Sequence, residues 1–556
     1  MSAVFLSAVF TLYNVATIYT GNVESFSFEL KHLLLVSIAP FLAITLALSS
    51  PAMLLRGSLL KVYAYCLCFL AAASWIYSGV FVWYFGLLDG RSWDFSRLES
   101  LKYYEIFGII VFWFLLFNIV VKKPRVFTYL ILFLNAGLMI LTAWSLVQDP
   151  KESSLQARPN LNALYRFSNE QNVLIVLMDA FQSDLFQELL KEDSTLADRF
   201  AGFTFFPDTV GVAASTYLTL PSIHSGQIYK AGLNLKEFYS SNIREGSFLN
   251  DLAAAGHEVT LVNPIRGDCP NLIELCIDSE EVLYGKSWAL VMETAFLFDL
   301  SLLRAVPLFY KRAIYNHRFW RIAPLLRSYM SLLEHNEPKH IAGNRVLDKL
   351  GQQGNVIGDR PATKFIHLLS THPPYVLDSN CKISRERLPE KRVAAKLQAK
   401  CAIDSFLDLL NDLRRKGLYD RSLIFLFADT GAGLHSSYIA QIPKKSLWRR
   451  LVGRANPIFL VKVPGAQGAL RESVASIQPS DLAATVCAVT RHCYSNGGIS
   501  VFDTVATRRR SRIFWHYTWR NEYWVKLPDI RGFELEGPVW EQESWINYTQ
   551  SDWNRY

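Results

Sequence analysis

The sequence predicts a mixed α/β protein in which membrane-spanning helices precede a larger domain built on a mostly parallel sheet. The chain has 556 residues, 51% of them hydrophobic, and the apolar excess is concentrated before residue 148. After residue 171, short apolar runs alternate with stretches of helical spacing, which is typical of parallel sheets covered by helices. We therefore expect a helical membrane domain in 1–147, a polar linker in 148–171 and an α/β domain in 172–556.

Five apolar segments before residue 148 are long enough to cross about 30 Å of hydrocarbon. Basic residues set their direction, because positively charged loops stay on the cytoplasmic side. Arg56 and Lys61 lie between the second and third segments, and Lys122 and Lys123 between the fourth and fifth. We therefore expect a multi-pass protein of the cell membrane with a cytoplasmic N-terminus and an extracytoplasmic C-terminal domain. The expected spans are 4–20, which lacks the features of a signal peptide, and 33–55, 62–88, 103–121 and 126–147.

The charge pattern excludes some functions. The formal net charge is +8 and the basic residues are scattered, so a nucleic-acid partner is not expected and attraction to an anionic membrane surface is the simpler use. Few charged residues fall inside the spans, which argues against an ion pathway or a transporter. The segment 287–329 is apolar but too charged to span a bilayer. It either packs against the membrane surface or the spans, or forms ordinary core helices.

Six of the eight cysteines lie in the extracytoplasmic domain. An even number in an oxidising compartment indicates disulfides, and free buried thiols are the alternative. The favoured pairs are Cys269–Cys276, Cys487–Cys493 and, as the two that remain, Cys381–Cys401.

The α/β domain begins at an apolar run, 173–178, that is followed by Asp179. An unbroken apolar run of this length is typical of a strand buried on both faces. Asp179 then falls at the carboxyl end of that strand, where open α/β sheets bind their ligands. The alternative is that Asp179 only caps the next helix. Further runs at 257–262, 364–369, 422–428 and 457–463 predict the other strands, with a long helix at 396–416.

Two residues with hydroxyl groups form a second candidate for the functional site. Ser215 and Thr216 open a predicted helix, where backbone N–H groups and the helix dipole stabilise negative charge. His367 lies within a predicted strand, and His372 follows its end. A hydroxyl group can attack an ester as a nucleophile, and a histidine can donate a proton to it.

A third segment, 423–435, places Asp429 at the end of another strand, with glycines and His435 after it. Two carboxylates, a hydroxyl and a histidine together would form an oxygen and imidazole site for a divalent cation. Such a cation activates a coordinated hydroxyl and neutralises charge on a phosphate or sulfate ester.

The order of these motifs resembles the alkaline phosphatase and sulfatase superfamily. The likeness is to its membrane-anchored branch, which includes lipoteichoic acid synthases, phosphoethanolamine transferases and phosphoglycerol transferases. The resemblance implies five spans, a linker and a sulfatase-like domain. It implies that Asp179 binds metal, that Thr216 is the nucleophile with Ser215 as the alternative, and that His372 contacts substrate or metal.

One motif departs from the family. The usual Asp-His-Gly-Glu is here Asp429-Thr430-Gly431-Ala432, so Thr430 stands in place of the metal-binding imidazole and Ala432 in place of the acid. A neutral hydroxyl is a poor substitute for imidazole. Either His435 takes its place, or the metal is held loosely, or catalysis is lost.

The resemblance implies a metal-dependent hydrolase or transferase that acts on a phosphate or sulfate ester of a membrane lipid or envelope glycan. The expected cofactor is zinc, manganese, calcium or magnesium. The alternative is a catalytically degenerate sulfatase-like domain that binds a lipid and regulates. The residues expected to hold the metal are Asp179, Asp429, Thr216 and His435, with Thr216, Ser215 and His372 as the catalytic candidates.

Overall fold

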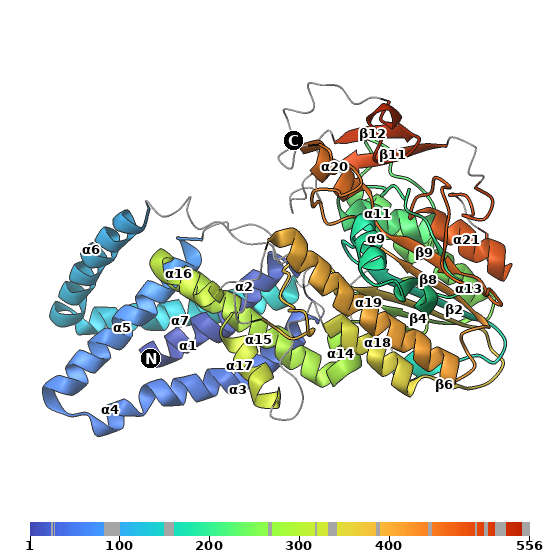
Figure 1. Ribbon diagram of the computed structural model, residues 1–556. Coiled ribbons are helices and arrows are strands. Elements are labelled where there is room, and N and C mark those ends of the chain that lie inside the picture. Colours follow the sequence, from blue (N-terminus) through green and yellow to red (C-terminus); the bar gives the residue numbers. More distant parts are fainter. Residues whose placement is uncertain are drawn as a thin grey trace. The chain divides into compact units, whose positions relative to one another are not determined.

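The structure of the chain is a computed structural model, shown in Figure 1. It describes residues 1–23, 26, 28–82, 101–148, 161–264, 269–316, 320–331, 342–384, 390–442, 447–494, 497–504, 510–517, 527 and 530–546. The chain divides into two compact units, Met1–Gln156 with Tyr284–Asn336, and Ala157–Leu283 with Glu337–Tyr556. The division into 1–147, 148–171 and 172–556 stays a prediction.

Among its described residues, the first unit contains five helices that are long and apolar enough to cross a membrane, one for each expected span. The third helix begins and ends earlier than expected, and residues 83–88 of that expected span lie outside the described residues. Proline at the first turn starts both α4 and α7, since proline fits that position. The elements are α1 (Ser2–Ala8), η1 (Val9–Tyr13), α2 (Asn14–Thr20), α3 (Leu30–Ser49), α4 (Pro51–Leu54), α5 (Gly57–Gly79), α6 (Leu101–Lys122) and α7 (Pro124–Val147).

The charged segment between the two parts of the sheet domain joins this helical unit. It forms α15 (Lys286–Ala305), α16 (Leu308–Tyr315) and α17 (Ile322–Ser331). Leu297 of α15 is fully buried in one apolar cluster with Tyr19 and Leu33 of the N-terminal helices. The Arg304 side chain donates to the hydroxyl of Thr17 (Nη1 to Oγ1, 2.8 Å). Of the two expectations for 287–329, packing against the spans is therefore the one observed.

The second unit is built on an eight-stranded sheet in the order β10-β3-β9-β8-β2-β7-β4-β5. The pairs that join β8, β2, β7, β4 and β5 to one another are parallel, as is the β10–β3 pair, whereas β9 runs antiparallel to its neighbours β3 and β8. This confirms the mostly parallel sheet. The strands are β2 (Asn172–Met178), β3 (Thr204–Phe205), β4 (Glu258–Val262), β5 (Leu275–Ile277), β7 (Ala362–Leu368), β8 (Ser422–Phe427), β9 (Phe459–Lys462) and β10 (Arg471–Glu472).

Helices cover both faces of the sheet, and strand β2 at its centre is buried throughout (Figure 1). Alternate β2 residues serve opposite cores, as the two-residue period of a strand requires. Val176 packs with α9, α18 and α19, whereas Leu177 packs with α11, α13 and α21. The helices are α9 (Ser183–Glu192), α11 (Thr216–Ser225), α13 (Phe248–Ala254), α18 (Ala342–Gln353), α19 (Lys391–Arg415) and α21 (Asp481–Thr490).

Shorter elements complete the second unit. The β11–β12 hairpin packs with α20 around the fully buried Trp448. These elements are α8 (Asn162–Tyr165), β1 (Arg166–Phe167), α10 (Leu196–Arg199), α12 (Leu235–Ser240), η4 (Ser241–Glu245), α14 (Ser279–Tyr284), β6 (Asn355–Val356), α20 (Leu447–Ala455), β11 (Ser511–His516), β12 (Arg531–Glu536) and η7 (Gln542–Ser544).

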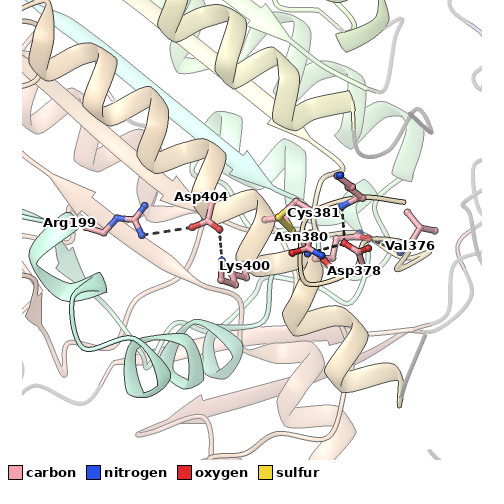
Figure 2. The surroundings of a disulfide bond; sticks show 10 residues. Arg199, Val376, Asp378, Asn380, Cys381, Lys400 and Asp404 are labelled. Atoms are coloured by element: carbon pink, nitrogen blue, oxygen red, sulfur yellow. Dashed lines mark hydrogen bonds and ion pairs between the residues drawn. A yellow bond between two sulfur atoms is a disulfide. The ribbon is translucent and has the colours of Figure 1, made fainter. Parts of the chain in front are cut away.

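The three expected disulfides are present: Cys269–Cys276, Cys381–Cys401 and Cys487–Cys493. Figure 2 shows Cys381–Cys401, which ties a loop after β7 to helix α19. Within that loop, Asp378 accepts hydrogen bonds from the backbone N–H groups of Asn380 and Cys381 at 2.9 and 3.1 Å. The disulfide therefore fixes to the helix a loop that already has its own local order.

Removing the Cys381–Cys401 bridge should lower the stability of the second unit. The two cysteines are 20 residues apart, and a closed loop of this size restricts the unfolded chain by about 3 kcal/mol in the chain-entropy model. We expect the paired serine substitution of Cys381 and Cys401 to lower the melting temperature of the detergent-solubilised protein. Cys66→Ser, at a free thiol in α5, is the control and should not lower it. Equal melting temperatures for all three proteins would contradict this expectation.

Candidate active site

The two carboxylates predicted from the sequence emerge side by side because their strands are parallel neighbours. Leu177 of β2 pairs in register with Phe427 of β8. Asp179 and Asp429 each stand two residues beyond these partners. Their side chains therefore leave the sheet at the same edge and toward the same face, the face covered by α11.

Helix α11 presents Thr216 to this pair of carboxylates. The Thr216 hydroxyl donates to Asp429 (Oγ1 to Oδ2, 2.6 Å). Ser215 is the residue before the helix, and its Oγ instead accepts from the backbone N–H of Tyr217 at 3.4 Å. Ser215 therefore caps the N-terminus of α11, while the Thr216 hydroxyl contacts the carboxylate.

The turn after Asp179 directs a backbone donor into the site. Ala180 has a φ of 59°, a left-handed conformation that residues with a side chain rarely adopt. In this conformation its N–H donates to Asp429 Oδ1 at 3.3 Å. Thr371, in the loop after β7, holds the same turn, since its hydroxyl donates to the carbonyl of Asp179 at 2.7 Å. Backbone strain at a ligand-facing turn is common in active sites.

The two buried carboxylates differ in their affinity for a proton. Burial and the neighbouring Asp179 carboxylate raise the pKa of Asp429 to about 6, against the hydrogen bonds from Thr216 and Ala180. Burial also acts to raise the pKa of Asp179, but the His367 and His372 imidazoles and the Arg454 guanidinium bring it below its ordinary value. Without a bound cation, the pair therefore holds its first proton on Asp429.

The expected histidines are placed differently. His372 follows β7 beside Asp179, and its Nδ1 lies 2.6 Å from the carbonyl oxygen of Pro373. A carbonyl oxygen only accepts, so Nδ1 carries a proton and Nε2 faces away from this bond. His435 lies among arginines, since Arg392 donates to its carbonyl at 2.8 Å, and burial with Arg449 lowers its pKa. The structure therefore places His372, and not His435, beside the carboxylates.

Two residues of the site were not among those expected to act there. His367 lies on β7 in register with Leu177, and its Nε2 is 3.5 Å from Asp179 Oδ2. The sequence showed it as a histidine within an apolar strand. Arg454 reaches the site from the end of α20, where its Nη1 donates to the carbonyl of Gly431 at 2.9 Å. No motif marks Arg454 in the sequence.

The side chains around Asp179 and Asp429 determine whether the site can hold the expected divalent cation. Among the residues that the structure describes, no three His, Cys, Asp or Glu side chains form a ready metal centre. Asp179 and Asp429 nevertheless bring two carboxylates into a fully buried position, where a cation would relieve their repulsion. The buried imidazole of His367 has no hydrogen-bond partner on either ring nitrogen among the described residues. The carboxylates, the Thr216 hydroxyl and this imidazole are together a donor set that fits a divalent cation.

The chain is similar to several solved structures. A superfamily protein from Vibrio parahaemolyticus is 12% identical, with a TM-score of 0.39 over 72% of this chain and 86% of that one. The C-terminal periplasmic domain of EcEptC from Escherichia coli is 11% identical, with a TM-score of 0.36 over 64% and 94%. The lipoteichoic acid synthase LtaP from Listeria monocytogenes is 12% identical, with a TM-score of 0.34 over 60% and 75%.

No protein-family model and no curated protein matches the chain.

Proposed function

We propose that the chain is a membrane-bound member of the alkaline phosphatase superfamily that hydrolyses or transfers a phosphate or sulfate ester of an envelope lipid or glycan. The observation that carries this proposal is the 2.6 Å hydrogen bond from Thr216 Oγ1 to Asp429 Oδ2 at the strand ends. It pairs a hydroxyl nucleophile with a carboxylate whose raised pKa suits it to accept the proton. The apolar helices of the first unit support a lipid or envelope substrate.

In the proposed reaction, Thr216 Oγ1 attacks the phosphorus or sulfur atom and passes its proton to Asp429. The new bond joins Oγ1 to that atom, and the bond to the leaving oxygen breaks with its electron pair. The leaving oxygen takes a proton from water, or from Nε2 of a His372 ring that carries a proton on both nitrogens. Water, or a hydroxyl of the acceptor, then attacks the same atom and passes its proton to His372 Nε2 or to the hydroxide left by the first step. The bond from that atom to Thr216 Oγ1 breaks, and Oγ1 recovers its proton from Asp429. The backbone N–H groups and the helix dipole at the start of α11 stabilise the negative charge on the transferred group.

The chain's own residues would also hold the expected cation. Asp179, Asp429 and Thr216 supply oxygen ligands, and when bound a divalent cation neutralises charge on the ester oxygens. Asp179 contributes by keeping its negative charge, which the neighbouring imidazoles and Arg454 stabilise.

A covalent intermediate tests this proposal. The full-length protein in detergent micelles would be incubated with 4-nitrophenyl phosphate or 4-nitrophenyl sulfate and quenched in acid. Mass spectrometry of the peptide that contains Thr216 should find the added phosphoryl or sulfuryl group on that residue. The Ser215→Ala variant should still form the adduct and Thr216→Ala should not. An adduct on Ser215, or equal turnover in wild type and Thr216→Ala, would contradict the assignment.

One observation favours a second function. Thr430 and Ala432 stand where the resembled family carries an imidazole and an acid. A domain that has lost catalysis but keeps the pocket would bind a lipid headgroup and regulate. If the protein binds anionic lipid vesicles, forms no adduct and turns over neither ester, this regulatory function replaces the enzymatic one.

A further inference from the structure

The residue after Asp429 leaves the donor set one imidazole short of the resembled family. Thr430 is 2% exposed, and its neutral hydroxyl is a weak ligand. The other donors, Asp179, Asp429 and Thr216, all offer oxygen. If nothing replaced the imidazole, the site would suit magnesium or calcium, which prefer oxygen ligands.

His367 is the buried imidazole that lies next to these oxygens. It is fully buried, and its ring nitrogen Nε2 points toward Asp179 Oδ2 at 3.5 Å. Its position follows from register, because His367 and Leu177 pair on adjacent parallel strands and Asp179 lies two residues further on. Two ligands of a tetrahedral zinc ion, each about 2.0–2.2 Å from the metal, lie roughly 3.4 Å apart. The spacing of His367 Nε2 and Asp179 Oδ2 agrees with that value.

The hydrogen bonding of His367 differs from that of two other buried histidines. His224 bonds through Nδ1 to the Ser247 hydroxyl at 2.8 Å, and His257 bonds through both ring nitrogens. Among the described residues, Nδ1 of His367 has no hydrogen-bond partner, and Nε2 has the Asp179 carboxylate as an ion-pair partner at 3.5 Å. Buried polar groups are nearly always satisfied, so an exception calls for an absent partner. A cation held with Asp179 would supply that partner.

We propose that His367 supplies the imidazole ligand of the metal site, in place of the residue after Asp429. This inference rests on the proposed function, because it assigns a ligand to the cation of that site. An added nitrogen donor favours zinc over calcium and magnesium.

Calorimetric titration of the full-length, EDTA-treated protein with Zn²⁺ and with Mn²⁺ tests the proposal. His367→Gln should weaken Zn²⁺ binding by more than about 100-fold, beyond the 10–100-fold loss typical of residues that only orient a ligand. The control is His224→Gln, a buried histidine on the same face of the sheet, and its affinity should stay at the wild-type value. Adding Thr430→His to His367→Gln should restore binding, because it returns an imidazole beside Asp429.

The outcomes separate this inference from the proposed function. If the wild type binds Zn²⁺ tightly and His367→Gln binds equally well, His367 is not a ligand, although the metal-dependent function stands. If the wild type binds neither ion at millimolar concentration, the metal-dependent function and this inference both fail.

A spectroscopic measurement covers the case in which His367→Gln does not fold. Electron spin-echo spectroscopy of Mn²⁺ bound to a variant with glutamine at both His372 and His435 should still show coupling to an imidazole nitrogen. Because these substitutions remove the other two expected histidines, loss of that signal would overturn the proposal.

Discussion

Replacing Asp429 by asparagine should abolish activity and yet make the cation-free protein more stable. Asp429 accepts the Thr216 hydroxyl at 2.6 Å, so losing the proton acceptor should lower turnover of a nitrophenyl ester by about 10²–10⁴-fold. Asparagine has nearly the same shape but removes a buried charge that faces Asp179. The opposite signs of the two effects are typical of residues that serve function at the expense of stability.

The gain in stability should depend on pH in a defined direction. Burial and Asp179 raise the folded-state pKa of Asp429 to about 6, so the folded protein binds this proton more tightly than the unfolded chain. Stability therefore falls as pH rises from about 4 to about 6, and the ionised residue is destabilising above that window. In EDTA, the melting temperature of Asp429→Asn should exceed that of wild type at pH 8 and approach it as the pH falls to about 4.

Asp179→Asn is the matched control for this pair. The neighbouring imidazoles and Arg454 hold the pKa of Asp179 below its ordinary value, so its charge stabilises the folded state at neutral pH. Asp179→Asn should lose activity without gaining stability. A gain at both positions, or full activity in Asp429→Asn, would show that the carboxylates do not have these separate roles.

A methyl group at Gly431 should disrupt the loop that carries Asp429. A Cβ atom there would lie 1.9 Å from the carbonyl oxygen of Gly453, on the backbone of α20. The added Cβ is fixed to the backbone of the loop, and the atom that it meets belongs to the backbone of α20. Because no flexible side chain can move aside, the loop and α20 would have to separate. We expect Gly431→Ala to cost about 3 kcal/mol, the upper end of ordinary overpacking, and to lose activity because Asp429 moves away from Thr216.

Gly211→Ala is the control, because it lies against the same loop and has room for a methyl group. Its Cβ would meet the carbonyl oxygen of Asp429 at 3.5 Å, an ordinary contact. It should leave stability unchanged or raise it by up to about 1 kcal/mol. The melting temperatures and turnover of the two variants check this contrast. Similar values for both would mean that the Gly431–Gly453 contact does not hold the site.

The sequence alone was enough for features that depend on local pattern. Asn172–Met178 is apolar at six successive positions after the asparagine, and such a run is stable only where both faces of a strand are covered. The five apolar segments, the mostly parallel sheet and the three disulfides follow from length, alternation and cysteine count in the same way. Asp179 and Asp429 could be placed at strand ends for this reason, since a charge ends a buried run.

The tertiary structure decided which distant residues meet. Thr216 and Asp429 are 213 positions apart, and the packing of α11 on the same sheet face as Phe427 of β8 brings the hydroxyl to the carboxylate. The place of 287–329 also depends on distant partners, because the Arg304 side chain donates a hydrogen bond to Thr17 of α2. Local pattern does not encode such pairings.

The roles of the histidines also depend on packing that local sequence pattern does not encode. The sequence offered His435, close to Asp429 along the chain, as a ligand, but Gly433 with a φ of 67° lies between them and the chain leads His435 to Arg392. His367 was visible only as a polar residue in a buried strand. That its ring nitrogens have no hydrogen-bond partner among the described residues, and that one faces Asp179, depends on strand register and on every neighbour that packs around it. The sequence thus determined which residues are buried at strand ends, and packing determined which of them face each other.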